Sequence, residues 1–301
     1  MRGKGLARRL LAATILCAGA SPAGAAPFQV PAIVDPPSQI RHAGKVTFEQ
    51  LVTPDLAAAE HFYTGLFGWS FRDVPGIKLP YAIAYSDGHP VAGIIQRGMP
   101  AGERPGLAWL SFFSVPSADA AVKTATDHGA KVLVAPHSVM DRGREAVLAD
   151  PQGAVFAVLE STSGDPPDSV KPAGDWIWRA LLTTDPAADA AFYGAMFGFA
   201  AYPLPSPSGE KHLLLASENY ARATANTLPA KRPNLRPYWL DFVRVDNAAQ
   251  SVAKAVALGG RVIVEPRRDR HGGMIAVVAD PAGAPVGLFE WSEIDTKAVT
   301  Q

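Results

Sequence analysis

Each structural series in this chain begins with strand-like alternation and continues with helical spacing. Residues 46–53 have strand character, and residues 56–68 repeat apolar positions at the spacing of a helix. Asp55 is placed to cap this helix and Gly68 to end it. Three short strands are then predicted at 69–74, 81–85 and 91–96. A second series follows, with a strand at 108–115, a helix at 118–128 and strands at 131–136, 145–149 and 154–159. The predicted order is therefore βαβββ, twice.

The whole double series recurs 130 residues later. The segment LVTPDLAAAEHFYTGLFG at 51–68 corresponds to LLTTDPAADAAFYGAMFG at 181–198, and the turn at 150–154 corresponds to the turn at 280–284. The correspondence needs no gap between Ala43 and Glu290, which predicts a tandem duplication.

The duplication defines the organisation of the chain. The first copy is expected at 45–161 and the second at 175–292. The other expected segments are a signal peptide at 1–25, an extended proline-rich arm at 26–44, a linker at 162–174 and a tail at 293–301. Each copy is predicted to complete its own sheet and to have its own core.

One helix for every four strands leaves one face of a sheet uncovered. Two βαβββ units can pair around a shared concave sheet and carry their helices outside. We therefore predict an α+β fold in which tandem βαβββ units pair into two half-open barrel modules. Each module would enclose a concave, mostly apolar cavity of the kind that binds small molecules.

Composition and charge exclude several classes of protein. Hydrophobic residues make up 48% of the chain and charged residues 19%, which is typical of a globular protein rather than a disordered one. Lys plus Arg equals Asp plus Glu at 28 each, which argues against a dedicated nucleic-acid binder. Beyond residue 25 no apolar run approaches the length of a membrane span. No nucleophile elbow, phosphate-binding glycine loop or dinucleotide fingerprint occurs after residue 25.

The N-terminal segment has the pattern of an export signal. Four basic residues precede the apolar stretch at 10–20, and Ala23-Gly24-Ala25 supplies the small-x-small cleavage pattern. Removing residues 1–25 leaves 24 basic against 28 acidic residues and also removes Cys17, the only cysteine. The mature chain would therefore have no disulfide, thiol nucleophile or thiolate metal site, and its location would be periplasmic or secreted.

These motifs together resemble the vicinal oxygen chelate superfamily, which groups glyoxalase I, bleomycin-resistance proteins and extradiol dioxygenases. The resemblance rests on the Thr-x-Asp, Phe-Tyr and Phe-Gly elements of each first helix, on both Asp-Pro-x-Gly-Ala turns, and on the βαβββ duplication. It covers both copies, and it implies the same two-module fold.

The resemblance also implies a metal site, because family enzymes hold Fe, Mn, Ni or Zn with His, Gln or Glu on the first and fourth strands of the units. The positions of this chain that correspond are Phe48, Leu110, Ala157, Trp178, Leu240 and Gly287. None of them has a ligand side chain, so no cofactor and no metal is predicted. A slip of one or two residues would admit Gln50, whereas Glu160 and Glu290 have the wrong parity and are expected to face solvent at strand ends.

Strand parity also gives the candidate ligand-binding residues of the two cavities. They are Phe48, Gln50, Leu110, Phe112 and Ala157 in the first copy, and Trp178, Leu240, Phe242, Arg244 and Gly287 in the second. The mixture is mainly apolar or aromatic with one or two polar groups, which suits a flat organic molecule. The alternative is that these side chains only fill the core of the sheet. The hairpin segments 140–144 and 267–271 are basic and are expected to be solvated loops.

The sequence therefore predicts an exported, metal-free protein that binds a small hydrophobic or aromatic molecule. Two alternatives remain. One is a lyase or dioxygenase of the same superfamily that holds a divalent metal with displaced ligands, and the other is a non-catalytic scaffold or partner-binding protein. Fold alone does not distinguish them, and the oligomeric state is left open.

Cleavage after Ala25 gives a direct test of export. Because a cut there leaves Ala26 first and Pro27 second, N-terminal sequencing of the periplasmic fraction should give Ala26-Pro27-Phe28. Recovery of the uncleaved chain, beginning at Met1, from the cytosol would contradict the predicted signal.

Overall fold

The computed structural model describes residues 30–98, 108–139, 141–206, 209–229, 235–269 and 272–291. The predicted signal peptide, the first four residues of the arm and the tail lie outside these ranges. The described residues form two eight-stranded sheets, which we call module 1 (β1 to β8) and module 2 (β9 to β16). No helix in these ranges is long and apolar enough to cross a membrane.

Both modules follow the predicted element order. In module 1 the elements are β1 (Val46–Thr53), α2 (Leu56–Phe67), β2 (Ser70–Asp73), β3 (Tyr81–Ser86), β4 (His89–Gln96), β5 (Leu110–Ser114), α3 (Ala118–Asp127), β6 (Lys131–Val139), β7 (Gly143–Ala149) and β8 (Val155–Ser161). In module 2 they are β9 (Trp176–Thr183), α4 (Pro186–Phe197), β10 (Ala200–Pro203), β11 (His212–Ser217), β12 (Tyr220–Thr227), β13 (Tyr238–Val245), α5 (Ala248–Ala257), β14 (Arg261–Arg268), β15 (Met274–Ala279) and β16 (Pro285–Glu290). The predicted α+β tandem fold is confirmed.

The helix boundaries follow from local chemistry. The side chain of Asp55 accepts a hydrogen bond from the Ala58 amide, which satisfies one of the free donors at the start of α2. Gly68 ends this helix with a φ of 77°, a left-handed conformation that glycine adopts without strain. Asp185 and Gly198 do the same for α4.

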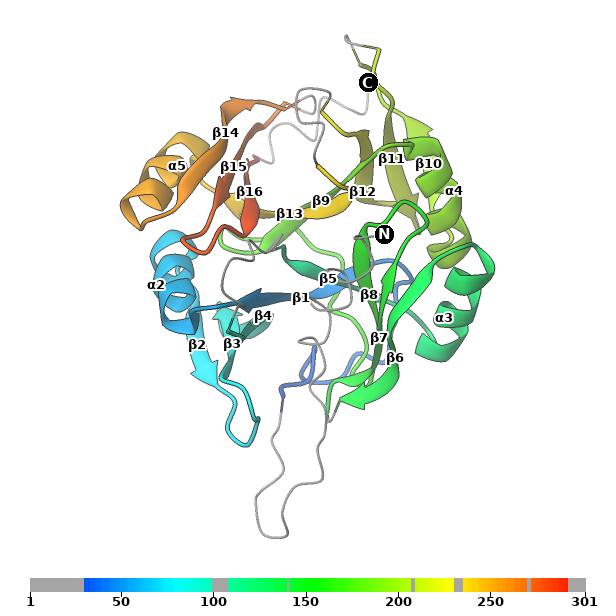
Figure 1. The fold of residues 1–301 in the computed structure, drawn as a ribbon, viewed down its shortest axis with the longest axis horizontal. Helices are drawn as coiled ribbons and strands as arrows, with labels where there is room; N and C mark the ends of the chain where they lie inside the picture. The colour runs from blue at the N-terminus through cyan, green and yellow to red at the C-terminus, as the bar shows by residue number, and fades with distance from the viewer. Residues whose placement is uncertain are drawn as a thin grey trace, which may run out of the picture.

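The two βαβββ units of each module pair through their first strands. The strand order is β2-β3-β4-β1-β5-β8-β7-β6 in module 1, and module 2 has the corresponding order. Strands β1 and β5 run antiparallel at the centre, where Phe48 lies opposite Phe112. Each sheet curls into a U, and the two U shapes stand back to back with their open sides facing away from each other (Figure 1).

The structure corrects the ungapped correspondence of the two copies. Gln50 on β1 pairs with Gly93 on β4, whereas the equivalent Ala180 on β9 pairs with Thr224 on β12. The offset is therefore 131 residues along the third and fourth strands of the first unit, although it is 130 in the first strands. One extra residue lies between the end of β10 and the start of β11.

The helices of one module pack against those of the other. Helix α2 contacts α5 at one side of the molecule, and α3 contacts α4 at the other (Figure 1). The apolar clusters on the convex faces consequently contain buried residues of both modules, such as Phe62 with Val252 and Phe156 with Phe192. Each sheet is complete in one copy, but the expectation of a separate core is wrong on this face.

The motifs that carry the family resemblance meet across this interface. Tyr63 of α2 donates a hydrogen bond to Asp280 at 3.1 Å, and Tyr193 of α4 donates to Asp150 at 3.0 Å. Asp150 also accepts hydrogen bonds from the amides of Gly153 and Ala154, which holds its turn closed. The Asp-Pro-x-Gly-Ala turn of each copy is therefore an acceptor for the first helix of the other.

A buried polar cluster occupies the centre of the interface. Arg179 lies 3.0 Å from Glu49 and 3.7 Å from Asp241, and Asp241 accepts from the Ser111 hydroxyl at 2.9 Å. Glu49 and Arg179 occupy equivalent positions of the two copies, as do Ser111 and Asp241. Burial raises the pKa of Glu49 well above its usual value and raises that of Asp241 to about 6, while Arg179 opposes both shifts.

This cluster predicts that stability falls as the pH rises. A carboxyl group whose pKa is raised by folding holds a proton that the unfolded chain releases, so its contribution is present below about pH 4 and is lost through pH 6. Asp241→Asn, which keeps an oxygen for Ser111, should flatten this dependence between pH 4 and pH 8 in urea unfolding. The matched control is Asp246→Asn at an exposed position. Parallel curves for wild type and Asp241→Asn would contradict the assignment.

Candidate functional site

The concave face of module 1 is closely packed. Of the predicted cavity residues, Phe48, Phe112 and Ala157 are fully buried there, and Leu110 packs against them half-buried. Val30 and Ile33 of the arm belong to the same cluster. Gln50 is 2% exposed and extends from the strand that carries Phe48. The arm therefore covers the side of this module on which a ligand would enter.

The concave face of module 2 is more open. Leu240 and Phe242 are buried beside Phe289, and Trp178 is half-buried against them. Gly287 lies directly beneath the Phe242 ring. Arg244 stands at the rim, where its Nη1 donates to the Lys171 carbonyl at 2.6 Å and its guanidinium lies 5.4 Å from the centre of the Trp291 ring. The predicted positions are thus brought together in two separate clusters, one in each module.

A cavity of about 1510 Å³ extends from the concave face of module 2 along the linker and the arm to β1 and the β3–β4 hairpin of module 1. Its walls include the arm at 31–35, the linker at 166 and 168–171, and the beginning of β9. Among the predicted candidates, Phe48 and Trp178 line it. The other aromatic side chains on its walls are Tyr85, Trp176, Tyr220, Phe289 and Trp291. The cavity is therefore large enough for a drug-sized molecule and offers several flat apolar surfaces.

Basic groups stand among the aromatic walls of this cavity. The Arg72 guanidinium lies 4.4 Å from the centre of the Tyr85 ring. Burial lowers the pKa of Lys171, whose positive charge Asp175 partly stabilises. Asp175 also lies 3.1 Å from His89, the histidine of the β3–β4 hairpin. The charges on the walls are thus mixed, with arginine and lysine near the aromatic rings.

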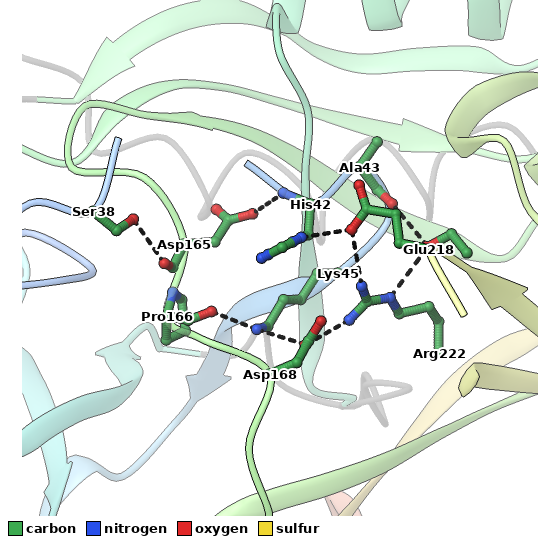
Figure 2. A network of polar contacts seen from close by, with 10 residues as sticks. Ser38, His42, Ala43, Lys45, Asp165, Pro166, Asp168, Glu218 and Arg222 are labelled. Carbon is green, nitrogen blue, oxygen red and sulfur yellow. Dashed lines mark hydrogen bonds and ion pairs between the residues drawn. The ribbon is translucent and has the colours of Figure 1, made fainter. Parts of the chain in front are cut away.

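An ionic network holds the arm, the linker and β12 together at one wall of the cavity (Figure 2). Asp168 of the linker lies 2.8 Å from Lys45 and 2.7 Å from Arg222. Burial alone would raise the pKa of Asp168, but hydrogen bonds from Arg222 and Lys45 lower it to about 2. His42 and Glu218 form a further pair at 2.5 Å. The network fixes the position of the linker, and with it one side of the cavity.

The same network contains three groups of metal-ligand type. Oxygen or nitrogen atoms of His42, Asp168 and Glu218 lie within 4.8 Å of one another. Because Lys45 and Arg222 already neutralise Asp168, a cation placed there would meet two positive charges. This cluster therefore fixes the linker against the arm and β12 and does not suit a metal ion.

The positions that hold a metal in family enzymes do not fit one in this chain. A Cβ atom added to Gly287 would lie 2.2 Å from the Phe242 ring, so no ligand side chain has room there. Gly93 on β4 is blocked in the same way by the Tyr81 hydroxyl. Phe48 and Phe112 fill the equivalent space of module 1, where their rings pack edge to face with centroids 6.0 Å apart. These carbon side chains offer no electron pair to a metal ion.

Glu160 and Glu290 have a role that the sequence did not indicate. Glu160 accepts a hydrogen bond from the Ala118 amide at 3.0 Å, and Glu290 accepts one from the Ala248 amide at 2.8 Å. Each carboxylate therefore lies at the start of a helix on the convex side, where negative charge is stabilised. Their parity is as expected, but they bind helix ends instead of facing solvent.

A buried polar group on the concave side of module 1 was also missed. Arg142 lies in the segment expected to be a solvated hairpin loop, yet its side chain is 0% exposed. Tyr81 and Glu145 are buried close to it. The composition of a hairpin gives no sign of such burial, which results from the curl of β6 and β7 over the sheet. Alternation along β7, which places Glu145 on the same face as Gly143 and Val147, was the available signal.

Comparison with protein families gives a match for each copy. Residues 39–158 match the family model described as the Glyoxalase/Bleomycin resistance protein/Dioxygenase superfamily. Residues 178–289 match the model of a glyoxalase-like domain. The two matches together span both modules.

Two kinds of curated relative are similar over most of the chain. The putative glyoxylase CFP32 of Mycobacterium tuberculosis (strain CDC 1551 / Oshkosh) is 32% identical over 245 residues, which cover 80% of this chain and 92% of the relative. The anthracycline biosynthesis protein DnrV of Streptomyces peucetius is 32% identical over 269 residues, which cover 83% and 94%.

Solved structures share the fold at low sequence identity. The Mn(II)-bound glyoxalase from Novosphingobium aromaticivorans has a TM-score of 0.58 at 14% identity, with 84% of each chain covered. The 2,3-dioxygenase LapB from Pseudomonas sp. KL28 has a TM-score of 0.56 at 15% identity, with 82% of this chain and 93% of that chain covered. At such identities the likeness concerns the fold alone.

Proposed function

The chain belongs to the glyoxalase/bleomycin resistance protein/dioxygenase superfamily, and from this premise we propose that it binds a small aromatic molecule without a catalytic metal. The observation that carries the proposal is the aromatic-lined cavity, whose walls come from both modules and include the concave face of module 2. We also propose that the protein acts outside the cytoplasm, on the basis of the predicted signal peptide.

Trp178 is the best-placed side chain for stacking on a flat ligand. Its ring is half-buried in the concave cluster of module 2 and also lines the cavity. Its Nε1 donates to the Thr224 hydroxyl at 3.4 Å, which orients the indole. Phe289 and Trp291 line the same cavity, so a ligand there would contact aromatic surface from several strands.

The names of the relatives are compatible with this ligand class. DnrV is named as an anthracycline biosynthesis protein, and anthracyclines are flat polycyclic aromatic compounds. CFP32 is named as a putative glyoxylase. In this chain, the side chains of Phe48 and Leu110 contain only carbon and Gly287 has no side chain, which supports the metal-free proposal.

Metal content tests the second part of the proposal. Protein purified without chelator, loaded in turn with Fe, Mn, Ni, Co and Zn and then dialysed, should retain no near-stoichiometric ion in elemental analysis, because the candidate positions lack donor atoms. An ion that survives dialysis and is lost in Gln50→Leu would replace the proposal by the metal-dependent lyase or dioxygenase alternative.

Ligand binding tests the first part. Titration with 1,4-dihydroxyanthraquinone, followed by fluorescence, should saturate. Trp178→Ala should weaken the affinity about 2- to 13-fold, since a stacking face contributes roughly 0.5–1.5 kcal/mol beyond its buried area. The matched control is Tyr202→Ala, which removes an aromatic side chain that is 55% exposed on β10.

Two outcomes would count against this site. Equal affinity in wild type and Trp178→Ala would place the ligand elsewhere in the molecule. Absence of saturable binding, together with absence of metal, would favour the scaffold alternative.

A further inference from the structure

Module 1 has a buried polar group that its counterpart lacks. Arg142, Tyr81, Glu145 and Gln50 are all buried on or beside its concave face. At the equivalent positions of module 2, Gly272 and Ala180 replace Arg142 and Gln50. The two copies have therefore diverged at this place, and module 1 alone has a guanidinium there.

The Arg142 guanidinium is held in place by two contacts. It lies 3.8 Å from the centre of the Phe48 ring, and its Nη1 donates to the Tyr81 hydroxyl at 3.5 Å. The side chain is 0% exposed, so these contacts fix the charge inside the module. A cation over an aromatic face is stabilised, but only in part, relative to the same cation in water.

The other edge of the guanidinium has no acceptor. Nε and Nη2 of Arg142 are buried and have no hydrogen-bond partner in the described part of the chain. These two nitrogens form the side of an arginine that holds a carboxylate through two parallel hydrogen bonds. Arg144, two residues further on, uses the same pair of atoms to bind Asp119 at 2.6 and 2.9 Å.

No carboxylate of the described residues forms an ion pair with Arg142. Glu145 is near, since its charge and that of Arg142 both act on the pKa of Tyr81, but its recorded ionic contact is His137 at 3.5 Å. A buried charge with free donors destabilises the folded state unless an acceptor is supplied. An anionic group that accepts hydrogen bonds from Nε and Nη2 of Arg142 would therefore stabilise the folded state.

Gln50 adds a further donor at the same place. Its Nε2 is buried and also has no partner among the described residues. Gln50 pairs with Gly93 on β4, and the Tyr81 hydroxyl lies over Gly93. Arg142 and Gln50 thus both border Tyr81, and the free groups of the two residues are all donors.

We propose that module 1 binds the carboxylate of a small organic acid, with Nε and Nη2 of Arg142 holding its two oxygens and Gln50 donating a third hydrogen bond. Phe48, which lies over this guanidinium, also lines the large aromatic cavity, so the acid site lies behind the module 1 wall of that cavity. Val30 and Ile33 of the arm pack in the cluster that contains Phe48, so the acid reaches Arg142 only when the arm moves aside.

Calorimetric titration of the full chain with benzoate tests this site, with benzamide as the uncharged ligand of the same shape. Benzoate should bind saturably and benzamide at least about 10-fold more weakly, because charge-assisted hydrogen bonds are the stronger ones. Arg142→Met should weaken benzoate binding about 10- to 100-fold. The matched control is Arg144→Met, which removes a partly exposed arginine already paired with Asp119.

A second variant decides the case if Arg142→Met fails to fold. Gln50→Leu keeps the volume of the side chain and removes the free donor, so it should weaken benzoate binding several-fold. Ile33→Ser should strengthen benzoate binding, since it loosens the arm. Equal binding of benzoate and benzamide, absence of saturable benzoate binding, or unchanged benzoate affinity in Arg142→Met and Gln50→Leu would overturn the proposal.

The acid site and the aromatic site are tested through different side chains, Arg142 and Trp178. Trp178→Ala should leave benzoate binding at Arg142 unchanged, and Arg142→Met should leave the binding of 1,4-dihydroxyanthraquinone unchanged. A loss of benzoate binding in Trp178→Ala would place benzoate in the cavity of module 2 and contradict the site at Arg142.

Discussion

The reciprocal hydrogen bonds between a tyrosine of one copy and an aspartate of the other organise the whole molecule. Tyr63 binds Asp280 and Tyr193 binds Asp150, inside clusters that are otherwise apolar. A buried hydroxyl or carboxylate without a partner destabilises the fold, so each turn requires the helix of the other copy. These bonds hold the convex faces together, so that the concave faces point outward, that of module 1 covered by the arm and that of module 2 more open.

The back-to-back arrangement explains how the two concave faces can differ. The concave clusters of the two modules have separate members, and the interface with its Glu49, Arg179 and Asp241 cluster lies between them. Module 2 has Trp178, Phe289 and Trp291 on the walls of the large cavity. Module 1 has buried Arg142 beneath the arm. One fold thus offers two environments, one aromatic and one cationic.

Sequence patterns predicted those features that depend on local periodicity. Helix-end chemistry predicted the caps at Asp55 and Gly68. Strand alternation predicted the βαβββ units and placed Phe48 and Trp178 beside the concave clusters. The burial of Arg142 and the helix-end contacts of Glu160 could not be predicted, because they depend on how distant strands curl. The shared core was missed since apolar positions on a helix do not reveal which copy covers them.

Each copy contains both partners of the interface, a tyrosine in its first helix and an aspartate in its last turn. Two separate chains with one copy each would therefore satisfy the same contacts around a two-fold axis, with identical surfaces facing each other. Such a homodimer would be restricted to two identical sites. The covalent linker removes that restriction, and it is what permits an arginine in one half and a glycine in the other.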